Sequence, residues 1–593
     1  MTAADPRDEE AALLRRLARN PDDPAAWLQI GIFHGRADRM TRAITAFREA
    51  LARRPAYPEA LNGIGIIWAS LQRSVPALAA FEQALSLRPA FAEAHYNMGR
   101  VLAGERRLAL AEAAFREAVR HRPHYRAARQ QLADLAVERN DHAEAVVQLR
   151  AVAAAAPADA GAREALAAQL SRAGSLEEAI GEYEAALALQ PRSLAGWLGL
   201  GVARFKANRL DDAGTAFERA HELGPDASPV HHNLGLIAQR RRQIGKAVEH
   251  YRRAMTIDPR NAHARAALGM CQLYLGDFAE GWANYEARED ATGGRSFQAL
   301  RASPRMIEWR GQEVPEGSAL LVLDEQGLGD MVQFLRFVPA LARRFARVLV
   351  ECRPPLTRLF ARTLGPGFEL RGRGEALPPD ISGYFVRIMS LPYALGVSAD
   401  AFAAAVPYVE ATAAERARLA LSADGASAAA RPRIGIAWAG NPAYPNDRAR
   451  SLPFDVVAPL LALDARWISL QKGPPAAALA AAPHVDRTID AAEDFADTAA
   501  IVDQLDLLVT ADTAVGHLAG AMGRPVWLLN RHDSEWRWML DRRESAWYPS
   551  MRIFTQPRPG DWPAVVDAVA RAIVERWPPV ARDRAWRQPE AVG

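Results

Sequence analysis

Two cysteines in 593 residues are too few for a disulfide framework or a four-cysteine metal site. The sequence also lacks the roughly 18 consecutive apolar residues that cross a bilayer, and its first twenty residues do not resemble a signal peptide. Its charge is nearly balanced, with 73 Lys and Arg against 70 Asp and Glu, which argues against a dedicated nucleic-acid-binding protein. These absences predict a cytoplasmic protein.

Several chemical motifs are missing as well. No Asp-x-Asp occurs, and no His, Cys and Asp group has metal-ligand spacing, so we expect neither a metal site nor a bound cofactor. A G-x-x-x-x-G-K-[ST] phosphate loop is absent, and so is a complete G-x-G-x-x-G after a strand. Their absence argues against a P-loop NTPase and against a dehydrogenase.

What the sequence does contain is a repeat of 34 residues. Proline marks it at Pro21, Pro55, Pro89, Pro123, Pro157, Pro191, Pro225 and Pro259. A small residue such as Gly65, an alanine such as Ala77 and a large apolar residue such as Phe81 recur in the same register. Positions four apart share one helix face, and proline ends a helix, so each repeat is predicted to be a pair of helices.

This pattern resembles the tetratricopeptide repeat (TPR). The resemblance covers residues 22–290, as seven full repeats and a divergent eighth with Gly281 where alanine is expected, after a capping helix over 1–21. Stacked repeats form an α-solenoid with a concave surface that holds peptides or protein partners. A rigid spacer or a dimerisation surface is the alternative.

Some TPR-bearing protein glycosyltransferases line this groove with an asparagine ladder, two residues before the small position. Here those positions are mostly not asparagine, so a folded partner or a helical segment is expected rather than an extended peptide. The candidate contacts with an acceptor protein are Asn97, Gln131 and Asn233.

The C-terminal half alternates strands with helices. Strands are predicted at 319–324, 347–351, 434–438, 467–470, 507–510 and 525–529. Such alternation indicates parallel α/β units. We expect two Rossmann-like domains, at 305–410 and 432–577, joined by a linker over 411–431 and followed by a tail over 578–593. Ligands bind such folds at the carboxyl ends of the strands.

The strongest chemical motif runs from Asp512 to Pro525, after the predicted strand at 507–510. Backbone N–H groups at the start of its helix can face an anion, and the hydroxyl of Thr513 and the ring of His517 add donors. This arrangement suits a pyrophosphate. An ordinary helix capped by Asp512 is the alternative.

D-T-x-x-x-H-L-A-x-A-x-G-x-P, combined with G-x-G-D after the strand at 319–324, resembles the heptosyltransferase-like GT-B glycosyltransferases over residues 305–577. The segments 435–441, 448–451, 469–472, 535–538 and 545–549 resemble the TPR-fused branch, which includes bacterial flagellin glycosyltransferases. Heptosyltransferases usually have glycine where this chain has Ala514.

The resemblance implies that Asp330 is the catalytic base, where a helix cap is the structural alternative. It implies that a nucleotide-activated sugar is held by Asn441, Arg448, Arg450, Gln471, Lys472, Asp512, Thr513, Ala514, Val515 and His517. The expected function is inverting, metal-independent transfer of a sugar to Ser or Thr hydroxyls of a protein, with flagellin as the leading candidate. A carbohydrate acceptor, such as a lipopolysaccharide core, and a non-catalytic scaffold with a relic GT-B domain remain alternatives.

Overall fold

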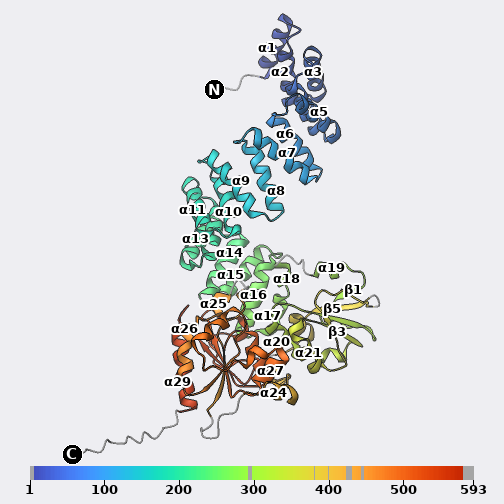
Figure 1. Ribbon diagram of the computed structural model, residues 1–593. Coiled ribbons are helices and arrows are strands. Elements are labelled where there is room, and N and C mark those ends of the chain that lie inside the picture. The colour runs from blue at the N-terminus through green and yellow to red at the C-terminus, as the bar shows by residue number, and fades with distance from the viewer. Residues whose placement is uncertain are drawn as a thin grey trace, which may run out of the picture. The chain divides into compact units, whose positions relative to one another are not determined.

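The computed structural model describes residues 6–291, 297–378, 381–398, 400–421, 431–442 and 447–578 (Figure 1). The chain divides into two compact units, Met1–Asp226 and Ala227–Gly593. This division falls inside the repeat array predicted from the sequence. Residues 422–430 of the expected linker and 579–593 of the expected tail lie outside the described residues.

The first unit consists of α-helices of similar length. They are α1 (Pro6–Arg19), α2 (Pro24–Arg36), α3 (Met40–Arg53), α4 (Pro58–Ser70), α5 (Ser74–Leu87), α6 (Ala92–Gly104), α7 (Leu108–His121), α8 (Arg126–Glu138), α9 (His142–Ala155), α10 (Ala160–Ala173), α11 (Leu176–Leu189), α12 (Leu194–Lys206) and α13 (Leu210–Leu223). From α2 onwards the helices pack as consecutive pairs. The predicted TPR solenoid is confirmed here.

Glycines of the first helix of a pair make room for an aromatic ring of the second. A β-carbon on Gly65 would lie 2.5 Å from Cε1 of Phe81. Gly63 stands at a position of the missing asparagine ladder, and a β-carbon there would lie 2.6 Å from Cζ of Phe47. Core packing therefore excludes an asparagine at that position, since its side chain would overlap the ring.

The second unit begins with four more helices of the same kind, α14 (Ser228–Arg240), α15 (Ile244–Ile257), α16 (Ala262–Leu275) and α17 (Phe278–Tyr285), followed by the short α18 (Arg288–Ala291). The divergent Gly281 lies in α17, where a β-carbon would be 2.9 Å from Cδ2 of Leu273. The last helix pair thus approaches more closely than alanine permits.

A parallel sheet of five strands follows, in the order β1 (Met306–Glu308), β5 (Gly383–Arg387), β2 (Ala319–Leu323), β3 (Arg347–Cys352) and β4 (Glu369–Gly372). The central strand β2 is almost wholly buried. The chain leaves β2 towards β3 on one side and returns to β5 on the other, so the strand order switches between β2 and β5. The helix α20 (Leu328–Phe334) starts just after β2.

A second parallel sheet has the order β10 (Met551–Thr555), β9 (Val526–Asn530), β8 (Leu507–Ala511), β6 (Arg433–Ala437) and β7 (Arg466–Ser469). Its switch lies between β6 and β8. The helices α28 (Ala514–Ala521) and α29 (Trp562–Arg576) pack against its strands β8, β9 and β10, and α27 (Phe495–Val502) packs against α28. The predicted parallel strands are confirmed, while β1, β4, β5 and β10 were not expected from the sequence.

Among the described residues, no helix combines the length and the apolar character needed to cross a lipid bilayer.

Candidate functional site

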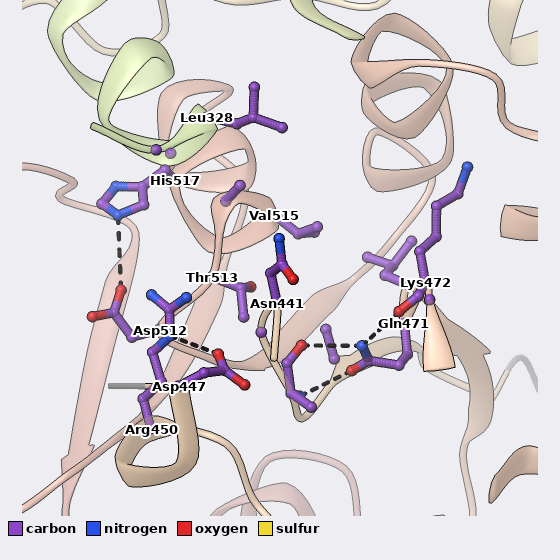
Figure 2. A pocket seen from close by; sticks show the side chains of 18 of the residues that line it. Leu328, Asn441, Asp447, Arg450, Gln471, Lys472, Asp512, Thr513, Val515 and His517 are labelled. Carbon is purple, nitrogen blue, oxygen red and sulfur yellow. Dashed lines mark hydrogen bonds and ion pairs between the residues drawn. The ribbon is translucent and has the colours of Figure 1, made fainter. Parts of the chain in front are cut away.

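A cavity of about 740 Å³ lies in the second unit, at the carboxyl ends of β2, β6 and β8. Parallel α/β sheets bind ligands at such strand ends, next to a switch in strand order. Its lining includes the G-x-G-D turn after β2 and the start of α28 after β8. Figure 2 shows several of the side chains that surround it. The two motifs that stood out in the sequence therefore share one cavity.

Helices α20 and α28 touch at Gly329, the second glycine of G-x-G-D. A β-carbon at this position would lie 2.8 Å from Cδ2 of His517 and 3.3 Å from Cα of Ala514. Because real β-carbons do not come within about 3 Å of another heavy atom, only glycine fits without a shift. Gly329 thus allows the two motifs to meet.

Asp330 follows in the first turn of α20. Its Oδ2 accepts the backbone N–H of Gly327 at 2.7 Å, so the helix-capping role that the sequence left open is present. Its Oδ1 accepts a hydrogen bond from the guanidinium of Arg537. Burial raises the pKa of Asp330, and the charge of Arg537 opposes that rise. Because burial and the charge of Arg537 act on this pKa in opposite directions, the Asp330 carboxylate can both remain ionised and take up a proton.

The sequence does not predict Arg537 as a site residue, although it lies between two tryptophans in Glu535–Trp538. Its guanidinium is buried and donates to Gln333 Oε1 at 2.8 Å, as well as to Asp330 and Glu535. It lies 4.4 Å from the centre of the Trp536 ring. Although burial lowers the pKa of Arg537, the two carboxylates raise it overall, so this cation is permanently charged.

His517 on α28 lines the cavity and faces Asp512 in Figure 2, and it is 5% exposed. Its Nδ1 lies 3.0 Å from the hydroxyl of Tyr548, and its ring stacks on Trp538 at 5.3 Å between centroids. Its Nε2 is 3.8 Å from Oδ1 of Asp512. Burial and the charge of Arg537 hold the pKa of His517 well below its usual range. The ring is therefore neutral and contributes hydrogen bonding rather than charge.

Thr513, and not Asp512, is the N-cap of α28. The Thr513 side chain makes no capping hydrogen bond; its Oγ1 lies 3.0 Å from Oγ1 of Thr510. The first N–H groups of any helix lack partners within that helix, and here Ala514 and Val515 line the cavity. Burial, with Glu535 nearby, raises the pKa of Asp512.

The loop after β6 brings Asn441 and Arg450 to the same cavity. Asp447 holds this loop together, because its carboxylate accepts Arg450 Nε at 3.1 Å and Ser451 Oγ at 2.8 Å. Arg448 lies in the short helix α25 (Asp447–Arg450), but its side chain and residues 443–446 lie outside the described part of the chain.

Gln471 and Lys472 follow β7 and line the cavity. Gln471 donates both amide hydrogens to backbone carbonyls, those of Ala439 and Lys472, each at 3.0 Å. Its Oε1 accepts the N–H groups of Trp438 at 3.0 Å and Ala439 at 2.9 Å. Gln471 therefore positions the loop after β6 and has no hydrogen left for a ligand. Lys472 Nζ donates to the carbonyl of Ala492.

The candidate groove residues lie on first helices of repeats. In the first unit, Asn97 on α6 donates to Asn62 Oδ1 at 3.0 Å, and Gln131 on α8 donates to Asp134 Oδ2 at 3.3 Å. In the second unit, Asn233 is half-buried on α14. Asn97 and Gln131 thus bond to side chains of the repeats themselves, and these hydrogen bonds hold the two amides in position.

A second cavity of about 380 Å³ is lined by α14, α16 and the segment after β9. Gln239, Arg240 and Tyr274 belong to its helical wall. Asp330 and Arg537 line both this cavity and the larger one. The carboxylate of Asp330 thus borders two cavities, and repeat helices form part of the wall of the smaller one.

Comparison with known families supports the repeat array. Residues 7–90 match the middle TPR-like domain of cilia and flagella-associated protein 70. Residues 77–126 and 169–228 match one tetratricopeptide repeat family, and residues 228–261 match another. These matches identify tetratricopeptide repeats within residues 77–261.

Protein FlbA of Caulobacter vibrioides is 28% identical over 331 residues, which is 51% of this chain and 53% of that protein. The chain thus spans about half the length of this curated relative. Among solved structures, YrrB, a TPR protein with an unusual peptide-binding site, is 22% identical, with a TM-score of 0.30 over 32% of this chain and 98% of that one. The C-terminal part of a TPR protein from Cytophaga hutchinsonii is 16% identical, with a TM-score of 0.35 over 41% of this chain and 99% of that one.

Proposed function

We propose that this chain is an inverting glycosyltransferase that moves a sugar from a nucleotide-activated donor to Ser or Thr hydroxyls of a protein. In this proposal the two parallel sheets are the two Rossmann-like domains of a GT-B enzyme. One observation carries it: Asp330 and the first turn of α28 line the same cavity, and Gly329 packs against His517. A base and an anion-binding turn are the two parts that such a transfer needs.

The donor diphosphate binds at the start of α28. Its backbone N–H groups and the helix dipole favour an anion, and the chains of Arg450 and Lys472 bring positive charge to the same cavity. Negative charge develops on the diphosphate as the glycosidic bond breaks, so these groups act most strongly at that moment. His517, being neutral, hydrogen-bonds the phosphate without adding charge.

Asp330 removes the proton from the acceptor hydroxyl. The hydroxyl oxygen then attacks the anomeric carbon, and the nucleoside diphosphate leaves with the electron pair of the broken bond. One displacement inverts the anomeric centre. Arg537 keeps the Asp330 carboxylate ionised before the reaction and positions it through their shared hydrogen bond. No metal ion is invoked, in keeping with the lack of an Asp-x-Asp motif.

The repeats recruit the acceptor protein. Holding it beside the catalytic domain raises its effective concentration, so the cavity need recognise little beyond a hydroxyl. The second cavity supports this arrangement, because repeat helices α14 and α16 and Asp330 line it together. Flagellin is the leading candidate acceptor, on the strength of the sequence resemblance alone.

The test is transfer to purified flagellin from a panel of nucleotide sugars, followed by intact-protein mass spectrometry. Asp330→Asn should lower transfer by at least about a hundredfold, the range of general-base catalysis. Asp567→Asn, an exposed change on α29, is the matched control and should leave transfer unchanged. Equal transfer by the Asp330→Asn protein and the unsubstituted protein would contradict the proposed role.

A non-catalytic scaffold is the second candidate. It is favoured by the fact that both oxygens of Asp330 already have structural partners, Gly327 and Arg537. A scaffold keeps its partner binding in the Asp330→Asn protein and shows no transfer with any donor. If the unsubstituted protein modifies the acceptor and the Asp330→Asn protein does not, the chain acts as an enzyme and not as a scaffold.

A further inference from the structure

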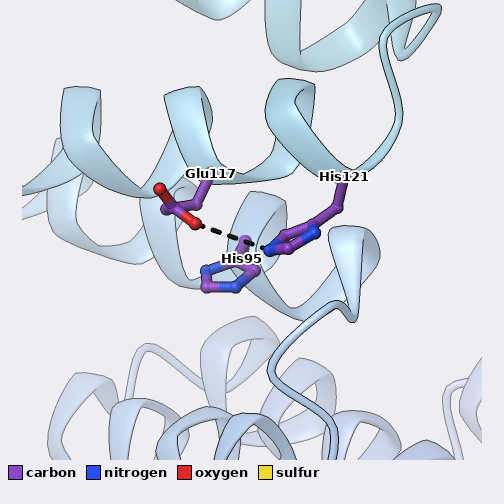
Figure 3. Close-up of side chains that lie close together, drawn as sticks. All are labelled: His95, Glu117 and His121. Carbon is purple, nitrogen blue, oxygen red and sulfur yellow. Dashed lines mark ion pairs between the residues drawn. The ribbon is translucent and has the colours of Figure 1, made fainter.

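Three side chains capable of binding a metal ion come together in the first unit, far along the chain from the cavity described above. They are His95 on α6 and Glu117 and His121 on α7 (Figure 3). One ligand atom from each lies within 4.8 Å of those of the other two. Sequence spacing did not reveal this group, because α6 and α7 must pack before His95 faces α7.

His95 has a defined tautomer. Its Nε2 lies 2.9 Å from the backbone carbonyl of Pro89, and a carbonyl oxygen can only accept, so Nε2 carries the hydrogen. The lone pair is therefore on Nδ1, which is buried and has no hydrogen-bond partner among the described residues. Metal-binding histidines commonly donate their other ring N–H to a backbone carbonyl in this way.

His121 also presents a lone pair. Its Nε2 lies 2.9 Å from Arg120 Nη2, and a guanidinium can only donate, so Nε2 accepts. The same nitrogen is 3.5 Å from Oε2 of Glu117. The His95 and His121 rings stack at 5.6 Å between centroids. A cation beside these two acceptor atoms can bond to both of them.

In this structure Arg120 supplies that cation. Its guanidinium bonds both Glu117 and His121. The Arg120 side chain is 65% exposed, so it can move into solvent and leave the position to another cation.

We propose that His95, Glu117 and His121 bind a divalent transition metal of the zinc class. Two imidazoles and a carboxylate suit zinc, whereas magnesium and calcium prefer oxygen ligands. Tetrahedral ligands at 2.0–2.1 Å from zinc lie about 3.3 Å apart, so small side-chain rotations close the site. With three protein ligands, the fourth position is left for water. This inference is independent of the proposed transferase activity.

The test is titration of the full-length, tag-free, metal-stripped protein with Co²⁺ followed by its visible absorption, and with Zn²⁺ by calorimetry. We expect one equivalent to bind and to be weakened at least about tenfold by His95→Ala and by Glu117→Gln. His124→Ala is the matched control, since His124 is exposed and just beyond α7. It should bind as the unsubstituted protein does.

Arg120→Ala separates a metal site from a merely structural cluster. Removing the competing guanidinium should tighten Zn²⁺ binding, while a structural cluster predicts no change. Circular dichroism checks that each variant is folded. Binding that His95→Ala and Glu117→Gln leave intact, or the absence of a stoichiometric site in the unsubstituted protein, would overturn the proposal.

Discussion

Gly329 lies so close to His517 that a β-carbon on the glycine would be 2.8 Å from Cδ2 of the imidazole. The contact joins the turn after β2 to the helix after β8, and with them the two sheets. Asp330, the proposed base, and the first turn of α28, the proposed anion-binding turn, line one cavity beside this close approach.

Gly329→Ala should lower stability by about 1–3 kcal/mol, since an added methyl group in a packed contact forces a shift. It should also weaken nucleotide binding, because α20 and α28 must move apart. Thermal unfolding and calorimetry with nucleoside diphosphates measure the two effects. Gly367→Ala is the control, as nothing lies within 4 Å of a β-carbon there. Equal melting temperatures for the two variants would count against the packing argument.

Arg537→Gln should shift the acidic limb of the pH–rate profile to higher pH. The charge of Arg537 lowers the pKa of Asp330, whose burial raises it. Without that charge the carboxylate ionises only at higher pH, and a base must be ionised to act. The measurement is kcat/KM for sugar transfer from pH 5 to 9. A profile that only drops in height, without moving along the pH axis, argues against Asp330 as the titrating base.

His517 should make the protein less stable in mild acid. Its pKa is held well below the usual value by burial, so below the unfolded-state pKa of about 6.5 only the unfolded chain takes up the proton. Stability is then lost as the pH falls, by at most about 1.4 kcal/mol per pH unit from this group. His517→Gln should show a smaller drop in melting temperature between pH 7.5 and 5.0. His124→Gln, an exposed change, should keep the full drop.

Gln471→Met should lower both stability and nucleotide affinity, because four backbone groups around the loop after β6 lose their partner. Buried groups left unpaired cost about 1–3 kcal/mol each. Gln504→Met is a matched control: Gln504 also bonds backbone groups, at Leu419, Ala500 and Leu421, but does not line the cavity. It should lower stability alone. A similar loss of affinity in both variants would show that Gln471 has no local role.

Removal of residues 1–226, the first compact unit, should abolish transfer to the protein acceptor and preserve nucleotide binding. Binding of a nucleoside diphosphate by calorimetry shows that the remaining unit is folded. Undiminished transfer to flagellin by the shortened protein would remove the recruiting role from these repeats, and the carbohydrate-acceptor alternative would then gain weight.

Local patterns were sufficient for much of the fold. The 34-residue period is visible because each repeat packs mainly on its neighbours, so the same positions must be small or large in every unit. The apolar strands β2, β3, β6, β7, β8 and β9 were recognisable for a similar reason, since each is buried in its sheet. The short strands β1 and β4 carry no such run, and in β5 and β10 an arginine adjoins the apolar residues.

The order of residues along the chain was enough to establish the repeats, the parallel strands, the G-x-G-D turn and the motif from Asp512 to Pro525, because each depends on neighbours in sequence. Contacts between segments that lie far apart in the sequence are seen only in the folded chain. Asp330 acquires its partner Arg537 when the segment after β9 reaches α20, and Gln471 loses its free amide to the loop after β6. His95 meets Glu117 and His121 only once α6 lies on α7. Each such pairing depends on packing between elements, which no periodicity within one element records.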